Sequence, residues 1–306
     1  MDGPFCSISK RPLRRIAWGA VAAVMLLIDG RAVADPPKMA IPATAATKPM
    51  RIMSLSLCTD LLLLQLVPRS RIASVTYVAH GGAQALFPGA DKGVAVNHGA
   101  AEDIIAEKPD LILASDYAAP ATLRLAARAL RTPVVQVQNA NSFAEIRQTI
   151  RQVGAAVGEP ERAEGLIRRM DATLAEIGKT PLRKPLRVVA WGGGDSVPGK
   201  GTLANTVIEA AGGVNIAATP DGYYSTFDVE QLLLADPDAL VYARPPFSEP
   251  SLRGDEGQHR IVRTLYGGRR IAYNEAASTC GLPQSATSAL SLHRAFLTLP
   301  EKKALF

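Results

Sequence analysis

The sequence predicts an α/β fold: two doubly wound lobes with parallel-type sheets, a long helical connector between them, and a ligand cleft where the lobes face each other. Three observations support this prediction. Residues 50–140 alternate apolar strand-like runs with helical segments, an order typical of parallel sheets with helical crossovers. Residues 141–180 follow a helical period almost throughout, and residues 181–306 resume the alternation. Finally, residues 101–113 and 229–241 align with each other without a gap.

A leader segment precedes the fold. Residues 10–15 are basic, residues 16–28 form an apolar run, and Ala-Val-Ala at 32–34 offers the small residues that a signal peptidase reads. We therefore interpret residues 1–34 as a signal peptide. The alternative is a membrane anchor, but a helix of this length rises only about 20 Å, short of the roughly 30 Å hydrocarbon core of a bilayer.

We expect the mature chain to be free in the periplasm. A lipid-anchored protein would need a cysteine directly after the apolar run, whereas Cys6 lies before it. Residues 35–49 are rich in Pro, Ala and Thr and predict a flexible lead-in. No later segment is apolar over a length that would span a bilayer. We expect the protein to act in the periplasm as a monomer.

The charge of the mature chain argues against nucleic acid as a partner. The full sequence has 34 Lys and Arg against 28 Asp and Glu. The leader holds five of the basic residues and two of the acidic ones, so the mature chain keeps 29 against 26, a net charge of +3. The mature chain also has no dense basic run of the kind that binds phosphate backbones.

The elements of each lobe follow from the positions of the apolar runs. The N-terminal lobe is predicted to contain strands at 51–57, 72–78, 110–114 and 133–137, and helices at 58–66, 101–107 and 120–130. The connector is predicted to be helical from 142 to 178 and interrupted at 158–160. The C-terminal lobe is predicted to contain strands at 186–191, 238–243 and 269–275, and helices at 202–213, 228–235, 261–267 and 287–299.

The repeat reads AEDIIAEKPDLIL at 101–113 and VEQLLLADPDALV at 229–241. In each copy the proline ends a helix and the aspartate begins the turn into a strand. In each copy a glutamate, Glu102 or Glu230, stands near the positive end of the helix dipole. Local structure therefore explains the Pro-Asp pair well. It explains the glutamates less well, because Ser, Thr or Asp would serve equally at a helix start.

Four motifs follow one another along the chain: SLSLCTDLLLLQL, AEDIIAEKPDLILA, AAGGVNIAA and DVEQLLLADPDALVY. In this order they resemble the periplasmic binding proteins with a helical backbone, which serve ABC importers of ferric siderophores, cobalamin and haem. The resemblance covers residues 50 to 295. It implies a binding protein rather than an enzyme, and a dimeric ABC permease in the inner membrane as its partner. It also implies that Glu102 and Glu230 dock onto arginines of the two permease subunits.

Aromatic residues are few, and several fall in loops predicted to line the cleft. Their faces are suited to pack against a corrin, a porphyrin or a catechol, although each is equally well explained as a loop-packing residue. Arg244 is a candidate partner for an anionic chelate, or else an outward-facing surface residue. We expect no resident cofactor, because the ligand itself would be a ferric chelate or cobalamin. The aromatic candidates are Tyr77, Tyr117, Trp191, Tyr223 and Tyr224.

Two further features leave alternatives open. Cys58 and Cys280 either form a disulfide, as an oxidising compartment permits, or are two independent buried residues. Residues 194–201, GDSVPGKG, nearly match a phosphate-binding P-loop, but Gly201 stands where the hydroxyl that binds Mg²⁺ is required. We therefore interpret this stretch as a glycine-rich loop at the cleft.

The four histidines allow two other functions to be weighed. A carrier of free metal ions would bring several His and carboxylate side chains to one point. His98 lies four residues before Glu102, but the repeat already explains that glutamate, and the other three histidines do not cluster in the sequence. His80 is a candidate axial ligand for haem or cobalt, or a solvated loop residue. Neither His259 nor His293 has the sequence context of a catalytic triad, and no G-x-S-x-G motif is present. An exported hydrolase is therefore the weaker alternative to a binding protein.

Overall fold

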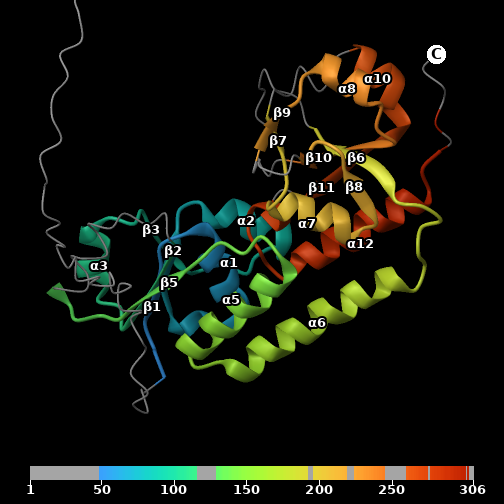
Figure 1. The fold of residues 1–306 in the computed structure, drawn as a ribbon. Coiled ribbons are helices and arrows are strands. Elements are labelled where there is room, and N and C mark those ends of the chain that lie inside the picture. Colours follow the sequence, from blue (N-terminus) through green and yellow to red (C-terminus); the bar gives the residue numbers. More distant parts are fainter. Residues whose placement is uncertain are drawn as a thin grey trace, which may run out of the picture. The chain divides into compact units, whose positions relative to one another are not determined.

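Two parallel β-sheets organise the computed structural model (Figure 1). All described residues belong to one compact unit, Ala46–Phe306. The predicted leader, most of the lead-in and the predicted helix 120–130 up to residue 128 lie outside the described residues. The described residues are 48–115, 129–191, 196–218, 224–244, 260–274, 276–300 and 302.

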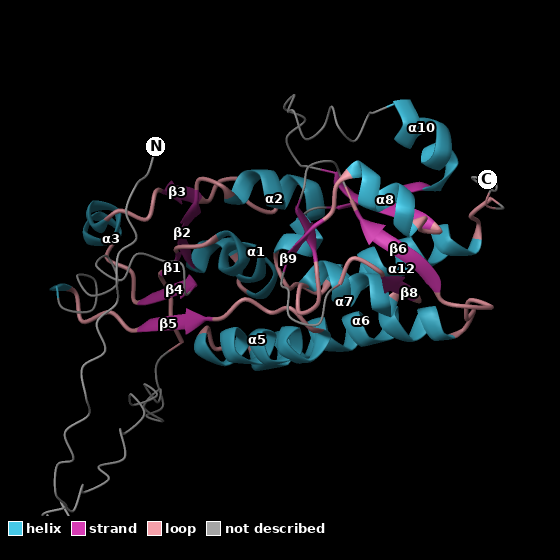
Figure 2. Cartoon of the chain, turned by 45° about the horizontal axis from the view of Figure 1, so that its top comes forward, coloured by secondary structure: helices cyan, strands magenta, loops and turns pink. Residues whose placement is uncertain are grey.

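The N-terminal sheet has five strands in the order β3-β2-β1-β4-β5, and every neighbouring pair is parallel (Figure 2). The structure confirms the predicted strands, but β3 was not predicted because it is short and two of its three residues are exposed. The strands are β1 (Ile52–Ser54), β2 (Ile72–Thr76), β3 (Ala95–Asn97), β4 (Leu111–Ser115) and β5 (Val134–Val137). The helices are α1 (Leu57–Leu66), α2 (Ala79–Leu86) and α3 (Ala101–Glu107), with a 3₁₀ turn η1 (Arg69–Arg71).

The C-terminal sheet has four parallel strands in the order β11-β10-β6-β8. The predicted helix 202–213 was too long, because Gly212 has a φ of 91° and turns the chain into β8. A separate antiparallel pair, β7 with β9, was not predicted. The strands are β6 (Leu186–Ala190), β7 (Ser196–Pro198), β8 (Gly213–Asn215), β9 (Tyr224–Thr226), β10 (Ala239–Arg244) and β11 (Arg270–Asn274). The helices are α7 (Leu203–Ala210), α8 (Val229–Ala235), α10 (Arg260–Tyr266), α11 (Ala276–Thr279) and α12 (Gln284–Leu297), with a 3₁₀ turn η2 (Gly267–Arg269).

The connector is a pair of packed helices, α5 (Phe143–Ala156) and α6 (Pro160–Gly178), interrupted where the sequence predicted. Ser142 begins α5 with a capping box, since its hydroxyl accepts from the Glu145 amide and the Glu145 carboxylate accepts from the Ser142 amide. The two helices approach closely at Gly154, where an added Cβ would lie 2.4 Å from the Cβ of Ala163. Along the second helix, α12 packs against α6 (Figure 1).

One apolar core runs through both lobes and the connector. It joins Ile52 of the N-terminal sheet, Ile150 of the connector and Val188 of the C-terminal sheet in a single cluster of buried side chains. A disulfide links Cys58 of α1 to Cys280, which precedes α12, so the two cysteines are paired rather than independent. Because the lobes share a core and a covalent bond, burial and chain connectivity both resist their separation.

One carboxyl group of α1 is buried against β2. Asp60 is fully buried, and its carboxylate accepts hydrogen bonds from the backbone amide and the hydroxyl of Thr76 in β2. Burial raises the pKa of Asp60 to about 7, against a smaller opposing effect of hydrogen bonds from Ser54 and Thr76. Between about pH 4 and pH 7 the Asp60 carboxyl group is therefore protonated in the folded protein, whereas in the unfolded chain it is ionised.

Asp60 should therefore make the protein less stable as the pH rises. Between pH 5 and pH 8 the folded state binds more protons than the unfolded state, so the free energy of unfolding falls by up to about 3 kcal/mol. In Asp60→Asn, which has nearly the same shape and no titrating group, this part of the pH dependence should vanish. Urea unfolding of both proteins at pH 5 and pH 8 measures it. Equal pH dependence in the two proteins would refute the role of Asp60.

Candidate ligand pocket and docking helices

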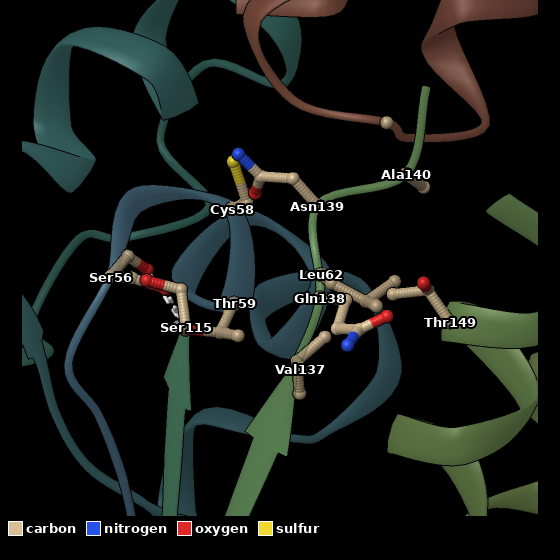
Figure 3. Close-up of a pocket in the computed structure, with 11 residues that line it drawn as sticks. Ser56, Cys58, Thr59, Leu62, Ser115, Val137, Gln138, Asn139, Ala140 and Thr149 are labelled. Atoms are coloured by element: carbon tan, nitrogen blue, oxygen red, sulfur yellow. Dashed lines mark hydrogen bonds between the residues drawn. The ribbon is translucent and has the colours of Figure 1, made fainter. Parts of the chain in front are cut away.

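A small pocket lies at the carboxyl ends of β1, β4 and β5, beside the start of α1 (Figure 3). Ligands of open parallel sheets bind at this edge. Ser56, Thr59 and Ser115 gather on one side of the pocket, while Gln138 and Asn139 follow β5 on the other. These side chains are polar but uncharged, so the pocket offers hydrogen-bond donors and acceptors without a fixed charge.

The hydroxyl groups of the pocket are held in place by one another. The Thr59 hydroxyl donates to the Ser56 carbonyl at 2.9 Å and lies 2.7 Å from the hydroxyls of both Ser54 and Ser56. This cluster was not predicted from the sequence, because serine and threonine at a strand-to-helix turn are explained by helix capping alone. Their place directly after the first strand of a parallel sheet was the signal that would have identified them.

The two copies of the repeat form helices of the same construction, α3 and α8, which we call the docking helices. Each has seven residues, and its glutamate, Glu102 or Glu230, is the exposed second residue. In the middle of each, Ile104 or Leu232 is buried. Each helix ends on a non-glycine residue in the left-handed region, Lys108 with φ 46° and Asp236 with φ 42°. The repeat in sequence is therefore a repeat in backbone geometry.

A family model described as periplasmic binding protein matches residues 73–264. The chain belongs to this family. Its members are binding proteins, so this periplasmic binding protein is not an enzyme and the hydrolase alternative is wrong. Among the residues that the structure describes, no helix has the length and apolar character needed to cross a membrane.

A curated relative and several solved structures are similar to this periplasmic binding protein. The relative is the uncharacterized ABC transporter substrate-binding lipoprotein YvrC of Bacillus subtilis (strain 168), 28% identical over 149 residues, 46% of this chain and 47% of that protein. The chain thus matches about half the length of this relative. The haem-binding protein RhuT of Roseiflexus sp. RS-1 is 24% identical with a TM-score of 0.63 over 80% of this chain and 97% of its own.

Two structures from Vibrio cholerae are similar in the same way. The haem-binding protein HutB is 20% identical with a TM-score of 0.65, and the vitamin B12 binding protein BtuF is 19% identical with a TM-score of 0.59. Each match covers 82% of this chain, together with 99% of HutB and 97% of BtuF. At these identities the structures establish the two-lobed fold of this periplasmic binding protein and nothing about its ligand.

The structure places two of the predicted aromatic residues on the surface. Tyr77, just after β2, is 63% exposed and stacks on His98, with ring centroids 5.5 Å apart and planes inclined by 16°. Tyr224 begins β9 and is 60% exposed. The other tyrosines predicted as ligand contacts, Tyr117 and Tyr223, lie outside the described residues.

Trp191 is not on the surface of the cleft, which corrects the prediction made for it. It is only 1% exposed and belongs to the core cluster of the C-terminal lobe. Its indole N–H donates to the Phe227 carbonyl at 3.0 Å, so its polar atom is satisfied within the fold. The backbone of Arg244 pairs with Asn274 at the end of β10, and its side chain lies outside the described part of the chain.

The histidines have separate structural roles. His80 contacts the Asp91 carboxylate at 2.7 Å on the surface. His293 is buried, and its two ring nitrogens lie 3.0 Å from the Ala211 carbonyl and 2.9 Å from the Thr180 carbonyl. His259 lies outside the described residues. Within the described ranges, no three His, Cys, Asp or Glu side chains come together as a metal-ion site would require.

The P-loop-like stretch has another local structure where it is described. Residues 196–198 form β7, which pairs with β9 rather than leading into a phosphate-binding turn. Thr202 caps α7: its hydroxyl accepts from the Asn205 amide at 3.2 Å and donates to the Gly199 carbonyl at 2.7 Å. The hydroxyl nearest to the position that a P-loop uses is thus engaged in a helix cap.

Proposed function

We propose that this protein captures a metal chelate outside the cytoplasm and delivers it to the permease of an ABC importer. The observation that carries the proposal is the pair of docking helices, which present Glu102 and Glu230 in the same helical position on the two lobes. The name of the curated relative, an ABC transporter substrate-binding lipoprotein, supports the same role. The predicted leader supports export of the chain.

A pair of exposed carboxylates is suited to a permease dimer. Two-fold related subunits present the same basic group twice, so a monomeric partner needs two similar acidic groups, one for each subunit. Carboxylate-to-arginine pairs are charge-assisted and directional, and they also steer the encounter of the two proteins. Both glutamates are exposed at helix starts, where the side chain is free to reach a partner.

A ferric siderophore or cobalamin is the ligand that we favour. The uncharged polar side chains of the pocket offer hydrogen bonds, and the exposed aromatic rings of Tyr77 and Tyr224 are of the kind that contact a corrin or a catechol. Haem is the second candidate, because RhuT and HutB are named as haem-binding proteins. The absorbance spectrum of the protein purified from its own host distinguishes these ligands, since ferric chelates, cobalamin and haem absorb differently.

Removal of both docking carboxylates should weaken binding to the permease. We expect Glu102→Ala/Glu230→Ala to bind the permease dimer roughly tenfold or more weakly, because each exposed charge pair loses its acidic partner. Biolayer interferometry on permease in lipid nanodiscs measures the affinity, and the loss should shrink at high salt.

The matched control removes the same charge elsewhere. Glu161 at the start of α6 and Glu209 in α7 are both exposed. Glu161→Ala/Glu209→Ala should therefore bind the permease within about twofold of the wild type, since long-range charge effects are screened. If the docking variant binds as tightly as this control, the assigned role of Glu102 and Glu230 is wrong.

A further inference from the structure

The aspartate of each Pro-Asp pair is hydrogen-bonded to the backbone at the start of the first strand of its sheet, just before β1 in the N-terminal lobe and within β6 in the C-terminal lobe. In the N-terminal lobe the Asp110 carboxylate accepts from the Met50 amide at 2.7 Å and from the Arg51 amide at 2.9 Å, and the Asp110 amide donates to the Arg51 carbonyl at 2.9 Å. In the C-terminal lobe the Asp238 carboxylate accepts from the Arg187 amide at 2.9 Å, and the Asp238 amide donates to the Arg187 carbonyl at 2.7 Å.

The arginine whose backbone amide donates to each aspartate also donates from its side chain to the docking helix of the same lobe. Arg51 donates to the carbonyl of Glu107, the last residue of α3, from Nε at 3.2 Å and from Nη2 at 2.5 Å. Arg187 donates from Nη2 to the carbonyl of Ala235, the last residue of α8, at 2.8 Å. Carbonyls at a helix end lack partners within the helix, and the guanidinium supplies one to each helix together with a favourable charge.

These four residues form what we call the strand–helix clamps: Asp110 with Arg51, and Asp238 with Arg187. Glu107 and Ala235 correspond in the repeat, at the same offset that relates Glu102 to Glu230. The same contacts therefore occur in both lobes although the surrounding side chains differ. Helix capping needs no particular strand, so capping alone does not explain why both helices are tied to the first strand of their sheet.

We infer that the strand–helix clamps are positioning devices for permease docking. Each clamp fixes the carboxyl end of a helix that is only about 10 Å long, and so fixes the direction in which the glutamate at its other end points. The buried side chains Ile104 and Leu232 hold the middle of each helix, and capping hydrogen bonds hold its amino end, so the clamp supplies the anchor at the carboxyl end. This inference rests on the proposed function and assigns to Arg51 and Arg187 a role that acts through Glu102 and Glu230.

The test is a double-mutant cycle on docking affinity. The arginines are exposed, so Arg51→Ala and Arg187→Ala should fold. We expect each to weaken permease binding about three- to tenfold, and Arg51→Lys to remain impaired, because an ammonium group lacks the fork of the guanidinium. On a Glu102→Ala background, Arg51→Ala should have no further effect, since the residue it positions is gone. Arg69→Ala, which removes an exposed guanidinium that donates to the Gly89 and Ala90 carbonyls, is the control and should bind as the wild type.

The outcomes separate the inference from the proposed function. Wild-type docking by Arg51→Ala and Arg187→Ala, with docking lost in Glu102→Ala/Glu230→Ala, would overturn the clamps and leave the proposed function intact. An equal loss from Arg51→Ala with and without Glu102 would also overturn them, because the arginine would then act independently. Wild-type docking by Glu102→Ala/Glu230→Ala would instead remove the docking role itself, and the inference with it.

Discussion

Replacing Cys58 and Cys280 by serine should lower the free energy of unfolding by about 2–5 kcal/mol. The disulfide joins residues 222 positions apart in the sequence, so its loss releases a very long loop in the unfolded chain. It also links α1 of the N-terminal lobe to the segment before α12. Urea unfolding of the wild type and Cys58→Ser/Cys280→Ser under oxidising conditions measures the difference.

Reduced wild type is the matched comparison for this variant. With the bond reduced by dithiothreitol, the wild type should unfold at nearly the same urea concentration as Cys58→Ser/Cys280→Ser, because both then lack the same crosslink. An oxidised wild type that unfolds at the same midpoint as the variant would show that the crosslink contributes nothing.

The two lobes are also in close contact beside the disulfide. A Cβ atom added at Gly281 would lie 2.4 Å from the Ala140 carbonyl oxygen.

The parts of the fold that could be predicted are those with long apolar signals. The helices α3, α5 and α6 follow the predicted ranges because each repeats apolar residues at helical spacing between clear start and stop residues. The strands β3 and β8 have only three residues each, and exposed positions within them interrupt any apolar pattern. They become strands because a neighbouring strand of the sheet pairs with them, which no local pattern records.

The candidate site was predicted less completely, for a physical reason. A tryptophan at the end of a strand is found as readily in a core as in a cleft, and only its surroundings decide between the two. Trp191 belongs to the same buried cluster as Leu240 and Val262. The pocket hydroxyls of Ser56 and Thr59 resemble helix caps, so their alignment with β4 and β5 appears only once the strand order is known. The repeat that contains Glu102 and Glu230 could be found from the sequence alone, because comparing two segments needs no tertiary structure.

The connector is hydrogen-bonded to both lobes, which bears on how the protein signals that a ligand is bound. In the middle of the connector, at the start of α6, the Arg162 guanidinium donates to the carbonyl of Leu66 in α1 of the N-terminal lobe at 3.0 Å. At the start of the connector, the Asn141 carbonyl accepts from the Thr206 hydroxyl of α7 in the C-terminal lobe at 2.6 Å. Together with the disulfide and the shared core, these contacts favour small adjustments of the lobes over wide opening.

Loss of the Arg71 guanidinium should destabilise the N-terminal lobe by about 2–5 kcal/mol, because the Val157 and Pro49 carbonyls lose their donor, although Lys48 still pairs with Glu159. Arg71 is only 5% exposed and donates to the Glu159 carboxylate and to the Val157 carbonyl, each at 2.6 Å, and to the Pro49 carbonyl at 2.7 Å. The Lys48 ammonium group, with a further contribution from Arg71, holds the pKa of Glu159 below its usual range. Arg71 thus ties the start of β2 to the corner between α5 and α6.

Arg71→Met keeps most of the aliphatic stem and removes these hydrogen bonds, whereas Arg69→Met removes an exposed guanidinium that also donates to two backbone carbonyls. Because water replaces a lost donor at an exposed site but not at a buried one, Arg69→Met should cost less than about 1 kcal/mol. Urea unfolding of both variants compares the two sites, and similar losses would show that burial of Arg71 adds nothing. Arg71→Met should lose more free energy of unfolding than Arg69→Met and keep its ligand affinity. It should also bind the permease more weakly, because the distance between Glu102 and Glu230 depends on how the connector is anchored.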